Sequence, residues 1–492
     1  MNLKNLLSVL QKYEITGESD LDITGFAYDS RKVKPGNLFA ALPGLEHHGS
    51  EFLAQAEKSG AVAFLSDRPL KSSLPVITVE NPREALAAFS NAFFQYPSTK
   101  LKLFGVTGTN GKTTTTYLLH SILEAAGLRT GLLGTVVYSG KEFRSDASLT
   151  TPESLDLQEM LSKMVAEKDE ACVMEVSSHS LVMSRVAGCA FEAAIFTNLT
   201  QDHLDFHKTM EKYFEAKKIL FDGHTCATKS AFINKDDPYG KRILDERKVS
   251  GLDSFSYGFS PGSTFRIRDW KTAPQGSNLV IRYEARDIKI KTPLLARYNA
   301  YNLCGAYAAA TVAGIDRNAI LQGIENMKQV PGRLEKIDHG QAFLIFIDYA
   351  HTEDALRQVL TTVRPYTKER LIVLFGCGGE RDKGKRPLMG RAAGELADEV
   401  ILTSDNPRTE NPNTIIQQIK AGVEKSGNTN LNIIPDRREA IEFALKLAAP
   451  ADTLLLAGKG HETYQVIGKE KQHFDEREIL AELLKTTDGH DK

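Results

Sequence analysis

A glycine-rich loop between a short apolar run and a helical pattern constrains the fold of this chain more than any other feature. Residues 101–106 predict a buried strand, and residues 113–126 predict a helix that ends at Gly127. Between them the chain reads Gly-Thr-Asn-Gly-Lys at 108–112. Glycines let backbone N–H groups curl around phosphate oxygens, and a helix N-terminus adds positive potential. The segment therefore predicts a nucleotide-phosphate site on an α/β unit.

The residues of this loop suit a bound nucleotide. Lys112 can reach the β- and γ-phosphates, and the Thr113 hydroxyl can hold Mg²⁺. Val106 stands where the strict GxxxxGK[ST] pattern has glycine, so the loop is a variant. Kinases, GTPases and ligases all need such a loop, so it leaves the reaction open. The predicted ATP-binding residues here are Gly108, Thr109, Asn110, Gly111, Lys112, Thr113 and Thr114.

Two breaks divide the 492 residues into three segments. The first lies near 95–99, after a helical run over 84–94, and the second near 330–333, after a helical run that ends around Met327. Short apolar runs alternate with longer amphipathic runs throughout, which is typical of α/β layering. At roughly 150 residues per domain, the length also predicts about three domains. We expect domains at 1–98, 99–330 and 331–492.

The last segment has the most regular pattern. Helical patterns over 355–363 and 414–423 lie between apolar runs, which predicts a parallel sheet. The four predicted strands are 343–347, 371–375, 400–403 and 453–456. Each is followed by a polar or glycine-rich cluster, at 348–351, 376–381, 405–408 and 458–462. Ligands sit beyond the carboxyl ends of parallel strands, so the four clusters predict one binding face.

Two further strand ends in the middle segment carry possible metal ligands. A strand-like run at 172–174 leads into Glu175, and another at 193–196 leads into a polar segment that contains His203. Both predicted ends lie at the same sheet edge as the glycine-rich loop. Mg²⁺ takes few protein ligands and completes its shell with phosphate and water, so Glu175 and His203 are candidates. We expect His179 and His207 to be structural.

Composition excludes several classes of protein. The formal net charge is −2, which leaves no basic footprint for nucleic acid. The five cysteines show no CxxC spacing, so a disulfide framework or structural zinc site is not expected. No run of about 18 apolar residues occurs, which predicts no membrane insertion. Residues 1–17 predict an amphipathic helix rather than a signal peptide, so we expect a cytoplasmic protein.

The motifs together resemble those of a known family. With residues 108–114 beside Asp202-His203-Leu204-Asp205 and Asp348-Tyr349-Ala350-His351, the chain resembles the Mur ligases over essentially its whole length. The resemblance implies a three-domain α/β architecture with a P-loop-type central ATPase domain and a Rossmann-like C-terminal domain. In order, the domains would bind UDP-MurNAc, ATP and an amino acid. We expect a monomer.

The resemblance also implies a reaction in peptidoglycan precursor synthesis. ATP would phosphorylate the terminal carboxylate of UDP-MurNAc-L-Ala-D-Glu, and the amine of an incoming amino acid would attack the acyl phosphate. A carboxylate is a poor acyl donor, so phosphorylation supplies the leaving group. The protein would chiefly position reactants and neutralise charge, with Lys112 and two Mg²⁺ ions in the second role.

Further site residues follow from the resemblance. A Tyr-x-x-Ala-Lys run places a carbamylated lysine at Lys217, which needs a depressed amine pKa; from the sequence alone Lys217 is a helix-surface lysine.

The implied catalytic residues are Lys112, Lys217 and His203. The implied metal ligands are Thr113, Glu175, His203 and Lys217 as its carbamate. The implied UDP-MurNAc-dipeptide residues are Ser30, Thr150, Thr151, Ser177 and Arg185. The implied adenine and ribose residues are Asn302, Arg333, Asp348 and His351. Some relatives have glutamine where this chain has Met183, and relatives often have proline where it has Glu353.

The motif Asp-Asn-Pro-Arg at 405–408 indicates which amino acid is added. meso-Diaminopimelate differs from L-lysine by one distal carboxylate, and an arginine is a planar, bidentate partner for that group. The resemblance assigns this motif to the diaminopimelate-adding members, and Glu462 would receive the distal ammonium. The implied diaminopimelate-binding residues are Arg381, Asp405, Asn406, Pro407, Arg408, Gly458 and Glu462. Glu380 replaces the aspartate that relatives often carry.

Three alternatives remain open from the sequence. The first is the lysine-adding ligase of the same family, which would lack the arginine at 408. The second is a folylpolyglutamate synthase, which has similar ATP chemistry but lacks a UDP-sugar domain like residues 1–98. The third is a nucleotide-dependent regulatory or scaffolding protein on a relic ligase fold, against which the intact Lys112, Glu175, His203 and Lys217 argue.

Overall fold

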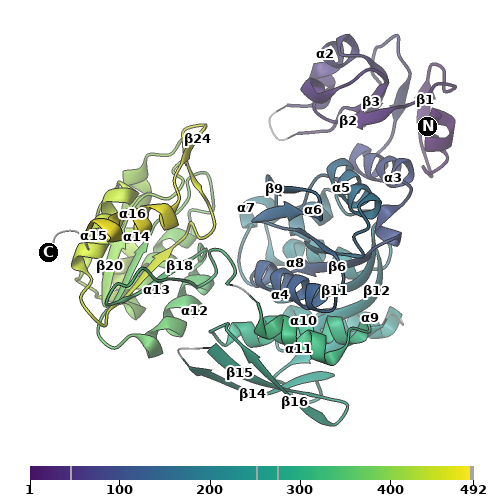
Figure 1. Cartoon of the computed structure of the whole chain (residues 1–492). Helices are drawn as coiled ribbons and strands as arrows, with labels where there is room; N and C mark the ends of the chain where they lie inside the picture. The colour runs from purple at the N-terminus through teal and green to yellow at the C-terminus, as the bar shows by residue number, and fades with distance from the viewer. Residues whose placement is uncertain (45–46, 251–252, 274–275, 328, 488–492) are drawn as a thin grey trace.

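Three sheets follow one another along the chain, and each is built from a different part of it (Figure 1). The computed structural model describes residues 1–44, 47–250, 253–273, 276–327 and 329–487. The first sheet lies at one end of the molecule, next to the central sheet, and the third stands beside the central one. No helix in these ranges is long and apolar enough to cross a bilayer.

The N-terminal sheet has five strands in the order β1-β5-β4-β3-β2, of which only β1 is antiparallel to its neighbour. The elements are α1 (Leu3–Leu7), β1 (Glu14–Thr16), β2 (Gly25–Ala27), β3 (Asn37–Ala40), α2 (Leu53–Lys58), β4 (Ala61–Ser66), β5 (Val76–Thr78) and α3 (Pro82–Phe93). The predicted helix at 84–94 is confirmed by α3. The predicted helix over 1–17 is mostly wrong, because helix α1 ends at Leu7 and residues 14–16 pair with β5.

The central sheet has eleven strands in the order β16-β15-β14-β13-β12-β11-β6-β10-β7-β8-β9. Its parallel centre runs from β14 to β7, and antiparallel strands extend both edges, β15 and β16 on one side and β8 and β9 on the other. The strands are β6 (Lys102–Thr107), β7 (Thr130–Leu133), β8 (Val137–Ser139), β9 (Arg144–Asp146), β10 (Ala171–Glu175), β11 (Ala190–Phe196), β12 (Ala227–Asn234), β13 (Ser254–Gly258), β14 (Phe265–Ala273), β15 (Gly276–Tyr283) and β16 (Arg286–Thr292).

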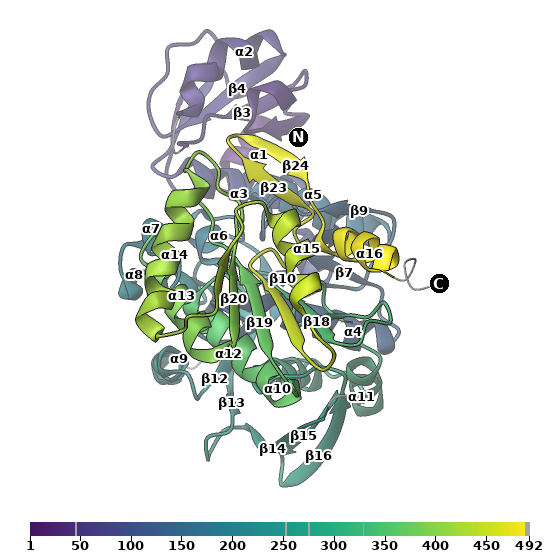
Figure 2. The ribbon, with the colours of Figure 1, turned by 90° about the vertical axis from the view of Figure 1, so that its left-hand side faces the viewer.

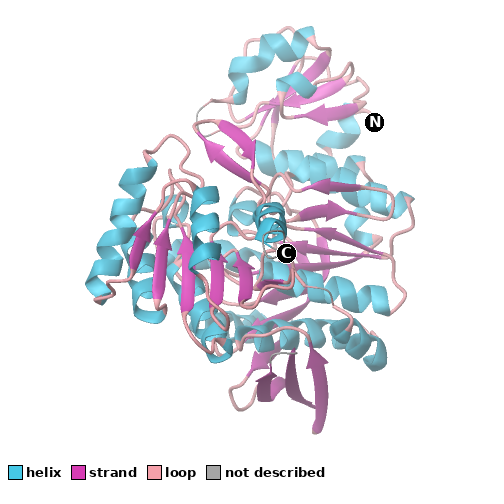
Figure 3. Cartoon of the chain, turned by 60° about the vertical axis from the view of Figure 1, so that its left-hand side comes forward, coloured by secondary structure: helices cyan, strands magenta, loops and turns pink. Residues whose placement is uncertain are grey.

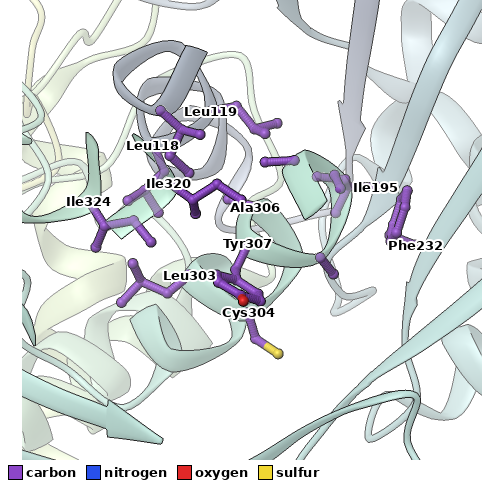
Figure 4. Packing of buried hydrophobic residues seen from close by; sticks show 14 of the residues in the cluster. Leu118, Leu119, Ile195, Phe232, Leu303, Cys304, Ala306, Tyr307, Ile320 and Ile324 are labelled. Atoms are coloured by element: carbon purple, nitrogen blue, oxygen red, sulfur yellow. The ribbon is translucent and has the colours of Figure 1, made fainter. Parts of the chain in front are cut away.

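Helices cover both faces of this sheet (Figure 3). They are α4 (Lys112–Ala125), α5 (Ser154–Ala166), α6 (Ser178–Val182), α7 (Leu204–His207), α8 (Met210–Lys218), α9 (Pro238–Ser250), α10 (Tyr298–Val312) and α11 (Arg317–Glu325). Side chains of β6 alternate between the two cores: Phe104 packs with α4, α10 and α11, and Leu103 packs against α5. Figure 4 shows the first core, where Leu118 of α4 lies beside Ile320 of α11 and near α10.

The C-terminal sheet has the order β17-β18-β22-β19-β20-β21, with five parallel strands and an antiparallel edge at β17. The elements are β17 (Glu335–Ile337), β18 (Leu344–Asp348), α12 (Glu353–Val363), β19 (Leu371–Phe375), α13 (Lys385–Leu396), β20 (Glu399–Leu402), α14 (Pro412–Ser426), β21 (Leu431–Ile433), α15 (Arg437–Leu447), β22 (Thr453–Ala457), β23 (Tyr464–Ile467), β24 (Glu470–His473) and α16 (Glu476–Thr487). Helices α12 to α14 pack on one face, and α15 and α16 on the other (Figure 2).

The four predicted C-terminal strands and their parallel pairing are confirmed by β18, β19, β20 and β22. The edge strands β17 and β21 and the hairpin β23–β24 were not predicted, because each is three or four residues long and carries no extended apolar run. In the central sheet, the strands predicted before Glu175 and before the segment with His203 are β10 and β11. They flank β6, so their carboxyl ends lie on either side of the glycine-rich loop.

Candidate functional site

The glycine-rich loop joins β6 to α4 and requires glycine at two positions. Gly108 has φ +151° and Gly111 has φ +87°, in the region that disfavours side chains. A Cβ at Gly108 would lie 1.8 Å from Thr197 Oγ1, and a Cβ at Gly111 would lie 2.4 Å from Asn302 Oδ1. The Asn110 N–H donates to Asn198 Oδ1 at 3.0 Å, which fixes the loop against the end of β11. Contacts with the end of β11 and with α10 therefore fix the conformation of the loop.

Two lysines converge on the first glycine of this loop. Lys112 Nζ donates to the carbonyls of Gly108 and Thr109 at 3.0 and 2.9 Å, and Lys217 Nζ donates to the Gly108 carbonyl at 2.8 Å. The surface position predicted for Lys217 from the sequence alone is wrong: the residue is 1% exposed, because this face of α8 packs on the sheet. Burial, and then the charge of Lys112, hold the pKa of Lys217 well below its usual value.

Hard oxygen ligands lie beside the lysines. Glu175, at the end of β10, is 1% exposed, and its Oε2 accepts hydrogen bonds from the Thr113 and Thr135 hydroxyls, each at 3.1 Å. His203 has φ +53° at the start of α7, and its Nε2 lies 3.5 Å from Asp202 Oδ2. Burial lowers the pKa of His203 to about 3, so the ring is neutral and can act as a ligand at neutral pH.

The two other histidines of this region lie beside His203. The buried His207 places Nε2 at 2.9 Å from Ser178 Oγ, and the ring centroid of His179 lies 5.0 Å from that of His203. Within the described ranges no group of three or more His, Cys, Asp or Glu side chains is arranged to hold a metal. Thr113, Glu175 and His203 are thus separate candidate ligands that share one edge of the sheet.

A cavity of about 550 Å³ opens next to the loop, between the central and C-terminal sheets. Three of the four residues predicted for adenine and ribose line it, namely Asn302, Arg333 and Asp348, together with Asn110, Gly111, Thr113 and Thr114 of the loop. Asp348 accepts the N–H groups of Leu334 at 2.6 Å and of Ala350 at 2.8 Å, and burial raises its pKa to about 6.

Arg333 crosses from the C-terminal part of the chain to the loop. Its Nη2 donates to Thr113 Oγ1 at 3.1 Å, and its guanidinium lies 4.7 Å from the ring centroid of Tyr349. The Tyr349 N–H donates to the Gly332 carbonyl at 2.8 Å, and a Cβ at Gly332 (φ +64°) would lie 2.1 Å from His461 N. The backbone of this linker is therefore fixed to the C-terminal sheet, while the Arg333 side chain lines the 550 Å³ cavity.

A second cavity, of about 390 Å³, lies between the same two sheets. Its central-sheet lining includes Thr150, His179 and His203, and its C-terminal lining includes Arg381, Asp405, Asn406, Arg408, Gly458 and Glu462. His351, predicted beside the adenine, lines this cavity instead, with Nε2 3.8 Å from Asp202 Oδ2. Pro407 is buried. The polar clusters that follow the four predicted strands thus meet on one face, opposite the edge with His203.

Charged and amide side chains at this cavity are hydrogen-bonded to one another. Asn406 Nδ2 donates to Glu462 Oε2 at 2.8 Å, and the fully buried Lys459 donates to the same oxygen at 3.1 Å and to Asn406 Oδ1 at 3.2 Å. Arg408 has φ +51°, a strained conformation for a side-chain-bearing residue, and its Nη1 donates to the Gly379 carbonyl at 2.7 Å. Such strain clusters at binding sites.

A third cavity, of about 590 Å³, lies in the N-terminal domain and contains Ser30, whose Oγ donates to Gln55 Oε1 at 2.9 Å. Arg83 and Glu153 also line it. Glu153 pairs with Arg83 at 3.2 Å and with Arg185 at 2.9 Å. This pairing connects the Ser30 cavity to the central sheet.

The remaining predicted dipeptide residues lie on the central-sheet side of that connection. Thr151 Oγ1 donates to the Glu175 carbonyl at 2.8 Å and accepts from the Ser177 N–H at 3.1 Å, and Arg185 Nη1 donates to the Thr151 carbonyl at 3.1 Å. Thr150 lines the 390 Å³ cavity. Met183 contacts Arg185 through Sδ at 3.4 Å. Hydrogen bonds and ion pairs therefore connect Arg83, which lines the Ser30 cavity, through Glu153, Arg185 and Thr151 to Glu175 beside the loop.

Family models match three successive parts of the chain. The model described as Mur ligase family, catalytic domain, matches residues 22–94; Mur ligase middle domain matches 106–310; and Mur ligase, glutamate ligase domain, matches 332–460. The chain belongs to the Mur ligase family.

Individual Mur ligases are similar to this chain over nearly its full length. The Clostridium acetobutylicum protein named UDP-N-acetylmuramoyl-L-alanyl-D-glutamate–2,6-diaminopimelate ligase 1 is 42% identical over 489 residues, which cover 99% of each chain. A ligase of that name from Solibacter usitatus is 44% identical and covers 94% of each chain. A solved structure of a ligase of that name superposes with a TM-score of 0.70 at 33% identity and covers 98% of this chain and 99% of that one.

The sequence motifs did not identify every residue around the Mur ligase cavities. The 550 Å³ cavity is also lined by Asn198, Asp236, Arg297, Tyr298 and Asn299. Asn198 follows β11 in the segment that was predicted to be polar, so its position at a parallel strand end was an available signal. Lys459 lies inside the predicted cluster 458–462, but no pattern showed that it is fully buried.

Proposed function

We propose that this Mur ligase joins meso-2,6-diaminopimelate to UDP-N-acetylmuramoyl-L-alanyl-D-glutamate at the expense of ATP, in peptidoglycan precursor synthesis in the cytoplasm. The observation that carries the proposal is the 390 Å³ cavity, in which Arg408, Arg381 and Glu462 of the C-terminal sheet face His203 and Thr150 of the central sheet. The names of the full-length relatives support the same substrates. Residues 1–98, 99–330 and 331–492 serve the UDP-sugar, the nucleotide and the amino acid in turn.

ATP binds in the 550 Å³ cavity with its phosphates in the glycine-rich loop. Lys112 and the N-terminus of α4 stabilise the negative charge that moves during phosphoryl transfer to the substrate carboxylate. Arg333 approaches the loop from the C-terminal domain and also stabilises this negative charge. Because the loop glycines are held by contacts with β11 and α10, these groups need little reorganisation during the reaction.

The residues present fit Mg²⁺. Thr113 and Glu175 place a hydroxyl and a carboxylate 3.1 Å apart at the loop, and His203 offers a neutral imidazole from the neighbouring strand end. With few protein ligands, such a site leaves positions for phosphate and water. Bound there, the ion would neutralise phosphate charge. A second ion would be held through the carbamate of Lys217.

The acyl phosphate then meets the amino acid between the two sheets. Arg185, Ser177 and Thr151 hold the peptide end of the UDP substrate, and Ser30 contributes to the nucleotide end. The amino acid enters the 390 Å³ cavity, where Arg408 binds its distal carboxylate as a bidentate pair and Glu462 receives the distal ammonium. Positioning the amine beside the acyl carbon accounts for most of the acceleration of this step.

Phosphate release tests the reaction directly. Full-length protein is given ATP, Mg²⁺ and UDP-MurNAc-L-Ala-D-Glu, and inorganic phosphate is measured with meso-diaminopimelate or L-lysine. We expect release with diaminopimelate and kcat/KM for lysine lower by about 10³-fold or more, because lysine leaves the arginine unpaired. Preference for lysine would assign the lysine-adding reaction. Glutamate-dependent release with a folate would assign folylpolyglutamate synthesis, and no release with any substrate would favour a regulatory protein.

A second experiment tests the role of Lys217. Burial and the charge of Lys112 hold the pKa of Lys217 well below the usual value, which favours the neutral amine, and the neutral amine is the form that reacts with CO₂. We expect a carbamate signal in ¹³C NMR after addition of ¹³C-bicarbonate, and we expect the signal to fall as the pH is lowered, because protonation removes the reactive amine. Lys217→Arg should lose this signal and about 100-fold or more of kcat.

The neighbouring Lys218 supplies the control for this experiment. It pairs with Glu215 at 2.8 Å on the outer face of α8, and that hydrogen bond raises its pKa. Lys218→Arg should therefore retain both the carbamate signal and the activity. A wild-type protein without the signal that is nevertheless fully active would contradict the carbamate assignment.

A further inference from the structure

Two arginines that take no part in the proposed reaction are among the largest fully buried side chains of the described residues. Arg386 lies on α13 and Arg437 opens α15, and the side chain of each is 0% exposed. Removing a guanidinium from water is costly even when it is ion-paired, and apolar side chains often pack the same space as well or better. These two residues therefore call for an explanation beyond core packing.

Arg437 binds the backbone at the ends of β20 and β22, which lie on either side of β19. Its Nη2 donates to the Ala457 carbonyl at 2.9 Å, and its Nη1 donates to the Ser404 carbonyl at 3.4 Å. Glu476, which is also fully buried, forms an ion pair with the guanidinium, with Oε1 2.8 Å from Nε. Ser404 and Ala457 are the residues immediately before the polar clusters 405–408 and 458–462. One guanidinium therefore ties together the starts of both loops.

The charge of Arg437 also reaches the cavity. Burial acts to raise the pKa of Asp405, but Lys459 and then Arg437 outweigh burial and hold that pKa below its usual value. Asp405 therefore remains a carboxylate inside the buried cluster. Its N-terminal neighbour Ser404 is the residue whose carbonyl Arg437 binds, so the same guanidinium acts on both the charge and the backbone of this loop.

Arg386 holds the backbone of a third loop, 376–381. Its Nη2 donates to the Gly378 carbonyl at 3.1 Å, and its two terminal nitrogens each lie 3.0 Å from an oxygen of Glu410. Glu410 in turn accepts the Glu380 N–H at 2.5 Å, directly before Arg381. Arg386 therefore fixes the loop 376–381 both directly and through Glu410, which lies two residues beyond Arg408.

We propose that Arg386 and Arg437 are positioning residues for amino-acid recognition. From the core of the C-terminal domain they fix three loop backbones, so that Arg381, Arg408 and Glu462 face one cavity at fixed separations. A zwitterionic distal group needs a cation and an anion at a defined spacing, and small displacements of such groups weaken recognition strongly. The inference rests on the proposed function and extends it to residues that do not touch the substrate.

The opposite end of the same sheet offers a matched control. Arg370 pairs with the buried Asp452 at 2.8 Å and donates to the Leu447 carbonyl at 2.8 Å. Arg370 and Asp452 directly precede β19 and β22, so they bind the starts of strands whose far ends carry the cavity loops. The pair thus resembles Arg437–Glu476 in chemistry but lies away from the cavity.

The experiment compares three variants of the full-length protein: Arg437→Met with Glu476→Leu, Arg386→Met, and the control Arg370→Met with Asp452→Leu. KM is measured separately for diaminopimelate, ATP and the UDP substrate, and folding is checked by circular dichroism and thermal melting. We expect KM for diaminopimelate to rise at least about tenfold in the first two, with KM for the other substrates changed by less than about twofold. The control should keep all three values, even if its Tm falls.

Conservative variants guard against loss of folding. Arg437→Lys and Arg386→Lys keep the charge but lose the planar fork, and should show a smaller rise in KM for diaminopimelate together with weaker discrimination against lysine. Folded variants with an unchanged diaminopimelate KM would overturn the proposal, and so would an equal rise for all three substrates or a rise in the control. If the wild type prefers another amino acid, the function assigned above fails, and the same comparison with that amino acid decides the positioning role.

Discussion

Replacing Lys112 by alanine is expected to lower kcat for ligation by about 10³-fold or more. The side chain is fixed over the loop by the carbonyls of Gly108 and Thr109, so its charge is already placed where phosphate charge moves. Preorganised charge of this kind acts mainly on the transition state, so kcat should fall more than KM for ATP rises. Phosphate release at saturating concentrations of all three substrates measures the effect.

The control for Lys112 is Lys102, which lies on the same strand-to-helix unit at the far end of β6 and reaches the Ala313 carbonyl at 3.5 Å. Lys102→Ala should retain wild-type kcat. Removing Lys112 also removes a positive charge that depresses the pKa of Lys217, so the ¹³C carbamate signal should be followed in the same variant. Retention of more than about a tenth of wild-type kcat in Lys112→Ala would contradict the assigned role.

Replacing Arg408 by alanine is expected to raise KM for diaminopimelate by about 100-fold, which corresponds to about 3 kcal/mol. Arg408 has a strained left-handed backbone and lines the 390 Å³ cavity, so its guanidinium is placed for a ligand at a cost to the free chain. The variant should also discriminate less between diaminopimelate and lysine, because the lost partner is specific to the distal carboxylate. KM for ATP should not change.

Arg408→Lys separates charge from geometry. Lysine keeps a cation but cannot form the bidentate pair, so KM for diaminopimelate should lie between those of the wild type and Arg408→Ala. Steady-state kinetics with each amino acid provide the measurement. Equal diaminopimelate kinetics for Arg408→Ala and the wild type would remove Arg408 from the binding site.

Local patterns predicted the elements that carry the cavities, because those elements are long and regular. The strand before Lys112, the helix after it and four parallel C-terminal strands were identified from periodicity and glycine placement alone. The loops of parallel strands share one edge of their sheet, so the polar clusters were expected to meet, and they line one cavity. Short edge strands such as β17 and β21 lack such patterns and were missed.

Tertiary packing decided the rest. Lys217 and Arg437 are charged residues on helices, and a sequence pattern places such residues at the surface. Both are buried, because each has a hydrogen-bond partner in another segment, the Gly108 carbonyl for Lys217 and Glu476 for Arg437. The adenine role expected for His351 stays a prediction, and its position in the lining of the 390 Å³ cavity depends on how two domains face each other, which local sequence does not encode. The contact between Arg333 and Thr113, 220 residues apart, depends on the same arrangement.

That contact bears on how inhibitors of this protein should be sought. The 550 Å³ cavity takes one wall from the central sheet and the other from Arg333, Asp348 and the face of α12. A screen on residues 99–330 alone would present compounds with half a binding site. A compound selected on the full chain would instead contact both walls, so it would compete with the nucleotide and also favour one relative orientation of the two domains.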